Sequence, residues 1–125
     1  MFRCIVVGVD GSEPSNRALT AACALSRTFG SEVHLVHGFE TASDSKASMV
    51  LEAAKTQAKT DGVSPSSSSA VDGEPYQELM TIAGLYNSDL IVTGRRGLGC
   101  IEGLISGSTS QQIAKHARCA VLTVK

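Results

Sequence analysis

The chain has 125 residues, which is enough for one domain with a buried core. Its hydrophobic content of 42% is typical of a globular protein, and its net charge of −1 argues against the strongly basic face of a nucleic-acid-binding protein. No apolar run approaches the roughly 18 residues of a membrane span, so we expect a cytoplasmic protein without nucleic-acid or membrane partners.

A near-continuous apolar run predicts a parallel strand over residues 3–9, covered on both faces. An acidic turn follows, in which Ser12 suits the N-cap of a helix and Pro14 suits its first turn. Gly30 is expected to end this helix. The predicted inner face carries Ala18, Leu19, Ala22, Cys23, Ser26 and Phe29.

A second strand is predicted over residues 32–38 and a second helix over residues 44–61, ended by Gly62. His34 and His37 are three apart, so on a strand they point to opposite faces and cannot chelate a metal together. The apolar face predicted for the helix consists of Met49, Val50, Ala53, Ala54 and Ala58.

The serine-rich segment that follows Pro65 predicts a polar edge strand near residues 66–72. The alternative is a four-stranded sheet in which this segment stays irregular. A third helix over residues 75–87 and a strand over residues 89–93 complete this part of the chain.

Glycines recur from Gly94 to Gly107, between that strand and a fourth helix that begins near Gly107. Glycines let backbone N–H groups approach an anion, and the helix N-terminus favours negative charge. Arg95 and Arg96 add two cations, although both could be solvated loop charges. The pattern therefore predicts a phosphate-bearing ligand. A final strand is expected over residues 119–124.

Gly94, two residues, Gly97, nine residues, Gly107 and then Ser108 resemble the ATP-binding signature of the universal stress protein family. The segment Gly-Val-Asp-Gly-Ser that ends at Ser12 extends the resemblance over the whole chain, residues 1–125, as a single domain. Alternating strands and helices already predict a doubly wound α/β fold. The resemblance implies the adenine nucleotide alpha hydrolase-like form, a five-stranded parallel sheet of order 3-2-1-4-5 with four helices.

The resemblance also implies a nucleotide site between the ends of the first and fourth strands. The residues expected to contribute are Val9, Asp10, Val36, Gly38, Gly94, Arg95, Gly97, Gly107, Ser108 and Thr109. The glycines would hold phosphate through backbone N–H groups, and backbone near Val36 to Gly38 would contact adenine. Asp10 could instead only cap the first helix, and Ser108 or Thr109 could be an ordinary N-cap.

We expect ATP or AMP, with Mg²⁺, as the ligand of a stress-response or signalling module, and a homodimer that pairs through residues 119–124. A slow adenine-nucleotide hydrolase and a dimeric module that binds no nucleotide are the alternatives. No general base stands out beyond Asp10, so hydrolysis is expected to be weak at most. The four cysteines have no zinc-binding spacing; Cys4, Cys23 and Cys119 are expected to be buried, and Cys100 lies in the glycine-rich loop.

Overall fold

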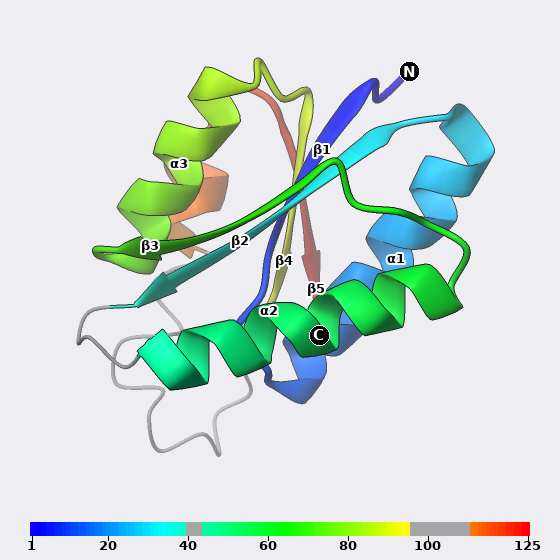
Figure 1. Ribbon diagram of the computed structural model, residues 1–125. Helices are drawn as coiled ribbons and strands as arrows, with labels where there is room; N and C mark the ends of the chain where they lie inside the picture. Colours follow the sequence, from blue (N-terminus) through cyan, green and yellow to red (C-terminus); the bar gives the residue numbers. More distant parts are fainter. Residues whose placement is uncertain (40–43, 96–110) are drawn as a thin grey trace.

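Five parallel strands form one sheet in the computed structural model, which describes residues 1–39, 44–95 and 111–125 (Figure 1). The strand order is β3-β2-β1-β4-β5, and every neighbouring pair is parallel. The fold class and strand order predicted from the sequence are therefore confirmed. The strands are β1 (Cys4–Gly8), β2 (Glu32–Phe39), β3 (Ser67–Asp72), β4 (Leu90–Gly94) and β5 (Ala120–Val124).

Helices cover both faces of this sheet, as the doubly wound pattern requires. The helices are α1 (Glu13–Phe29), α2 (Asp44–Thr60) and α3 (Pro75–Leu85), and residues 111–116 are also helical. One core cluster joins α1 and α2 to the sheet, and a second joins α3 and Ile113 to it. In Figure 1 α1 and α2 accordingly lie on one side of the strands and α3 on the other.

The central strands supply both clusters because side chains alternate between the faces of a strand. Val7 and Val92 belong to the cluster under α1 and α2, whereas Val6 and Ile91 belong to the cluster under α3. All four side chains have exposed fractions of 1% or less. Burial on both faces explains why these strands are near-continuous apolar runs.

Helix α1 has the boundaries that its capping residues predict. Ser12 is the N-cap, and its Oγ accepts a hydrogen bond from the N–H of Ser15 at 3.3 Å. Gly30 ends the helix in the left-handed conformation, at φ 69°, and its N–H donates to the carbonyl oxygen of Ser26 at 2.8 Å.

The serine-rich segment forms the edge strand β3, so the irregular alternative is wrong. Its register with β2 runs from His34 opposite Ser67 to Phe39 opposite Asp72. An edge strand needs only one hydrogen-bonded neighbour, and no residue of β3 is fully buried. A strand this polar is stable at the edge because few of its side chains must leave water.

Among the residues predicted above to face inward, Phe29, Met49 and Ala53 are exposed. In α2 the buried face consists of Ala47, Leu51, Ala54 and Ala58. The buried face of α2 is therefore rotated by about one residue from the predicted face. This rotation leaves Met49 72% exposed. An alanine-rich helix has no single strongly apolar stripe, so its neighbours decide its rotation. None of the helices in the described part of the chain is long and apolar enough to cross a membrane.

Candidate functional site

The predicted nucleotide site lies at the carboxyl edge of the sheet, the edge at which the strands end. Strands β1 and β4 are neighbours there, with Val7 opposite Val92. From β1 the chain proceeds through β2 to β3 on one side, while β4 and β5 lie on the other. The strand order therefore reverses between β1 and β4, which is where ligands bind in open α/β sheets.

Gly94 ends β4 directly against the first turn of α1. A Cβ atom at this position would lie 2.5 Å from the backbone nitrogen of Ser15 and 2.6 Å from the carbonyl oxygen of Pro14. Glycine is thus required for packing, apart from any contact with phosphate. The next residue, Arg95, is exposed, and its N–H donates to the carbonyl oxygen of Val124 at 2.6 Å.

Asp10 lies in the turn between β1 and α1, beside this contact. Its Oδ1 accepts a hydrogen bond from the N–H of Ser12 at 2.9 Å, and its own N–H donates to Ser15 Oγ at 3.0 Å. The carboxylate therefore stabilises the turn before α1, whereas the N-cap of α1 is Ser12 and not Asp10. Its contact with a nucleotide remains a prediction, and the two roles are compatible because a carboxylate has several acceptor sites.

Val9 and Val36, both predicted to contribute to the nucleotide site, are joined through their backbone. The N–H of Val9 donates to the carbonyl oxygen of Val36 at 2.8 Å. Their side chains, however, are buried in different core clusters, Val9 under α1 and α2 and Val36 under α3. The two side chains therefore lie on opposite faces of the sheet. Gly38 is half-buried near the end of β2, opposite Val71 of β3.

The rest of the predicted phosphate-binding segment lies outside the described residues. This applies to Arg96, Gly97, Cys100, Gly107, Ser108 and Thr109. Their roles stay predictions. The described part of the structure contributes the Asp10 turn, Gly94 and Arg95, and it brings these together.

Thr93, just before Gly94, is a candidate that the sequence analysis missed. Its side chain is buried on the α3 face of the sheet, close to Gly8. Within the described ranges its Oγ1 has no hydrogen-bond partner. A buried hydroxyl without a partner is costly and suits a ligand contact. The sequence signal that could have identified Thr93 is a polar residue at the end of an apolar strand.

The three cysteines in the described ranges are poor nucleophiles. Burial raises the pKa of the Cys23 thiol to about 11. Burial, then the Glu32 and Asp89 carboxylates, raises the pKa of Cys4, and burial also raises that of Cys119. Because the thiolate is the reactive form, none of these thiols is activated for attack at neutral pH. Cys119 is only half-buried, contrary to the expectation.

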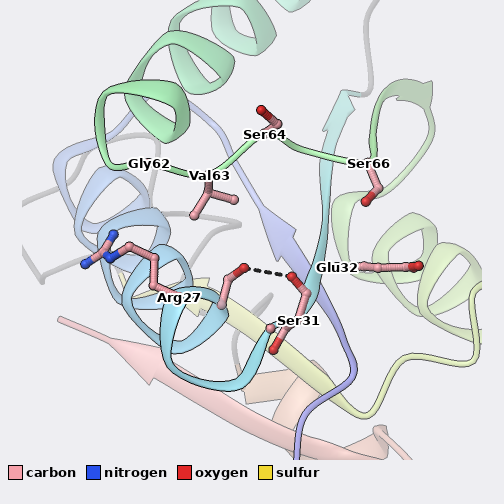
Figure 2. Close-up of a pocket in the computed structure, with 9 residues that line it drawn as sticks. Arg27, Ser31, Glu32, Gly62, Val63, Ser64 and Ser66 are labelled. Carbon is pink, nitrogen blue, oxygen red and sulfur yellow. Dashed lines mark hydrogen bonds between the residues drawn. The ribbon is translucent and has the colours of Figure 1, made fainter.

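A shallow hollow of about 330 Å³ opens at the opposite, amino edge of the sheet (Figure 2). It lies where α1 and α2 end, before β2 and β3 begin. Polar groups around it already bond to protein: Ser26 Oγ donates to the Ser31 carbonyl oxygen at 2.7 Å, and Arg27 donates to the Asp61 carbonyl oxygen at 2.5 Å. The hollow is therefore not the predicted nucleotide site, which lies at the other edge.

Comparisons with known proteins identify the family to which this chain is similar. The family model described as the universal stress protein family matches residues 1–125. A universal stress protein of Thermus aquaticus is 31% identical over 137 residues, and the universal stress protein YxiE of Bacillus subtilis is 28% identical over 149 residues; both matches cover 100% of each chain.

Solved structures show the same fold. A universal stress protein crystallised in complex with cAMP is 25% identical, with a TM-score of 0.83 over 99% of this chain and 97% of its own. A universal stress protein from Archaeoglobus fulgidus is 24% identical, with a TM-score of 0.81 over 100% of both chains, and is a match of fold alone.

Proposed function

The chain belongs to the universal stress protein family, and we propose that it is a stress-response or signalling module that binds an adenine nucleotide. Nucleotide binding would change its conformation or its choice of partner. The proposed ligand is ATP with Mg²⁺, at the carboxyl edge between β1 and β4. The proposed setting is the cytoplasm.

The observation that carries this proposal is the contact between Gly94 and the first turn of α1. It brings the Asp10 turn and the start of the glycine-rich segment to the one point where the strand order reverses. The relative solved with cAMP, whose fold covers almost the whole chain, supports an adenine nucleotide as the ligand class.

The proposed contacts follow from the chemistry of each residue. Backbone N–H groups of Gly94, Gly97 and Gly107 hold the phosphates, and Ser108 and Thr109 add hydroxyl donors. Arg95, which is exposed beside Gly94, supplies positive charge. On the other side Asp10 accepts from the ribose or lies near the metal, and the backbone from Val36 to Gly38 contacts adenine, with Val9 beside it.

A binding module is favoured over a hydrolase by the position of Asp10. Its carboxylate accepts from the N–H of Ser12 and helps hold the turn. A general base must be placed against the attacking water, and Asp10 is the one candidate base that stands out in the sequence. We therefore expect ATP hydrolysis to be slow compared with binding.

Isothermal titration of nucleotide-free protein with ATP and Mg²⁺ tests the proposal. We expect saturable heat and a rise in Tm, because a ligand that binds only the folded state stabilises it. Parallel titrations with AMP, with cAMP and with ATP plus a chelator identify the nucleotide and the need for metal. If none of these nucleotides gave heat or a thermal shift at millimolar concentration, the proposal would be wrong. The alternative, a module that binds no nucleotide, would then be favoured.

Two substitutions locate the site within the same experiment. Gly107→Val places a side chain in the proposed phosphate space and is expected to abolish binding while the circular dichroism spectrum is unchanged. Ser108→Ala removes one donor and is expected to cost about 0.5–1.5 kcal/mol of binding free energy. Ser64→Ala, at an exposed serine before β3, is the matched control and should bind as the wild type does.

A further inference from the structure

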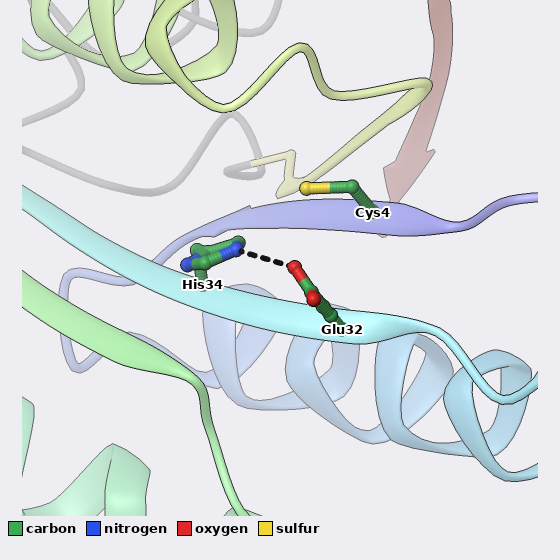
Figure 3. Close-up of side chains that lie close together, drawn as sticks. All are labelled: Cys4, Glu32 and His34. Carbon is green, nitrogen blue, oxygen red and sulfur yellow. Dashed lines mark ion pairs between the residues drawn. The ribbon is translucent and has the colours of Figure 1, made fainter.

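A second cluster of ligand-type side chains lies at the amino end of β1 and β2, away from the proposed nucleotide site. Cys4 of β1 and Glu32 of β2 are register partners, so their side chains share one face of the sheet. His34 is two residues after Glu32 and therefore lies on that face too. Figure 3 shows the three side chains together across the two strands.

The ring of His34 is held in one orientation. Its side chain is 5% exposed, and it stacks on Tyr86 with ring centroids 3.8 Å apart and planes 13° from parallel. Its Nδ1 is 2.7 Å from Ser67 Oγ. When Nδ1 carries the proton and donates it to Ser67, Nε2 has the free lone pair that a metal ligand needs.

That Nε2 atom is buried and has no hydrogen-bond partner among the residues that the structure describes. A buried polar atom without a partner costs free energy. The closest charged group is the Glu32 carboxylate, whose Oε2 lies 3.5 Å away. One ligand atom from each of Cys4, Glu32 and His34 lies within 4.8 Å of the other two.

We propose that Cys4, Glu32 and His34 bind a zinc-like divalent cation through Sγ, a carboxylate oxygen and Nε2, with water as the fourth ligand. Tetrahedral zinc places such atoms about 3.3–3.6 Å apart, given its bond lengths of about 2.0–2.3 Å. The cluster needs to contract by about 1 Å to reach that geometry. The Glu32 side chain is 67% exposed, so it has room to move toward the other two.

The surroundings support a cation at this position. The Asp89 carboxylate accepts hydrogen bonds from the N–H groups of Arg3 and Cys4, which places a further negative charge beside the thiol. A bound cation would stabilise the Cys4 thiolate. The mixed sulfur, nitrogen and oxygen set favours zinc and disfavours Mg²⁺, which prefers oxygen ligands.

The competing explanation is an ion pair between a protonated His34 and Glu32 alone. That pair needs no thiol, so removal of the Cys4 thiol distinguishes the metal site from the ion pair. In the metal site Cys4 contributes a metal–sulfur bond, and in the ion pair it is only a neighbour.

Titration of the full-length protein with Co²⁺ tests the proposal, after removal of metals with a chelator and in the absence of nucleotide. Co²⁺ replaces zinc and reports a thiolate ligand by sulfur-to-cobalt charge-transfer absorption. We expect one ion per chain with this absorption, its displacement by Zn²⁺ but not by Mg²⁺, and a higher Tm with Zn²⁺. Because no nucleotide is present, the result is independent of the proposed function.

Variants assign the ligands. Cys4→Ser should abolish the charge-transfer absorption, whereas Cys23→Ser, Cys100→Ser and Cys119→Ser should retain it. Glu32→Gln and His34→Gln should weaken Co²⁺ binding by about tenfold or more, and Ser67→Ala by about tenfold through loss of the bond that orients the ring. His116→Gln, at an exposed histidine, is the control for His34.

Absence of the absorption in the wild type, or its persistence in Cys4→Ser, would overturn the proposal. If Cys4→Ser or His34→Gln fails to fold, Glu32→Gln still decides, because its side chain is largely exposed. A Glu32→Gln variant that binds Co²⁺ as tightly as the wild type would exclude this three-ligand site.

Discussion

At Gly94 the end of β4 lies so close to α1 that a methyl group has no room. The atoms that a Cβ would meet are backbone atoms of Pro14 and Ser15, which cannot turn aside as a side chain would. The glycine that begins the predicted nucleotide signature is therefore also required by the packing of a helix on a strand.

Replacement of Gly94 by alanine is expected to lower the free energy of unfolding of the nucleotide-free protein by about 1–3 kcal/mol, as overpacking does. Chemical denaturation measures this change. Gly84→Ala is the matched control, because a Cβ at this exposed position of α3 meets nothing within 4 Å. It should be neutral or should stabilise the helix by up to about 1 kcal/mol. Equal effects of the two substitutions would contradict the packing argument.

Asp89 stabilises the amino end of β1 in a pH-dependent way. Burial raises its pKa, but hydrogen bonds from the N–H groups of Cys4 and Arg3 outweigh this and lower the pKa below its usual value of 3.8. The folded state thus favours the carboxylate more than the unfolded state does. The resulting stability is present above about pH 4 and is lost as the pH falls through the lower folded pKa.

Asp89→Asn should therefore cost about 1.5–3 kcal/mol at pH 7, the range for hydrogen bonds to a charged group. The difference from the wild type should shrink below pH 4, where the native carboxyl group becomes protonated. Urea denaturation across this range, with a chelator present, measures it. Asp72→Asn, at an exposed aspartate at the end of β3, is the control. A difference that stays constant with pH would show that charge is not the cause.

At the scale of elements, α1 depends on its N-cap. The Ser12 hydroxyl accepts from the N–H of Ser15 and thereby satisfies one of the free donors of the first turn. Ser12→Ala is expected to destabilise the protein by about 0.5–2 kcal/mol, and Ser12→Asp, which keeps an acceptor, should recover most of this. Thermal or urea denaturation measures both. If Ser12→Asp were as unstable as Ser12→Ala, capping would not be the role of this residue.

Strand β5 matters at the scale of the whole molecule, because it forms one edge of the sheet. Its apolar residues include Leu122, which is 36% exposed. An apolar edge strand without proline or charge is suited to pairing with another chain. We therefore predict a homodimer formed through β5 of each copy.

Sedimentation at micromolar concentration should give twice the monomer mass of 13.0 kDa. Leu122→Lys should shift the equilibrium toward the monomer, because the charge would be buried in the interface. Ala70→Lys, an exposed position on the opposite edge strand β3, is the matched control and should leave the dimer intact. A wild-type protein that sediments only as a monomer would refute the prediction.

Much of the architecture follows from the sequence by itself. Apolar runs placed the strands, and Ser12 and Gly30 placed both ends of α1, because these signals act between residues close together in the chain. The alternation of strands and helices, together with the family signature, was sufficient for the sheet order, and Pro65 with its serines indicated an edge strand. The candidate nucleotide site was predicted for the same reason, since its glycines are spaced along one segment.

Only the tertiary structure decided the features that arise between segments distant in the chain. The rotation of α2 was set by its neighbours, which left Met49 exposed and buried Leu51. The contact of Gly94 with α1 exists because β4 lies beside β1. Cys4 and His34 have no metal-binding spacing in the sequence, yet parallel pairing of β1 with β2 places them on one face. Sequence patterns report local periodicity, whereas such contacts depend on register and packing across the whole sheet.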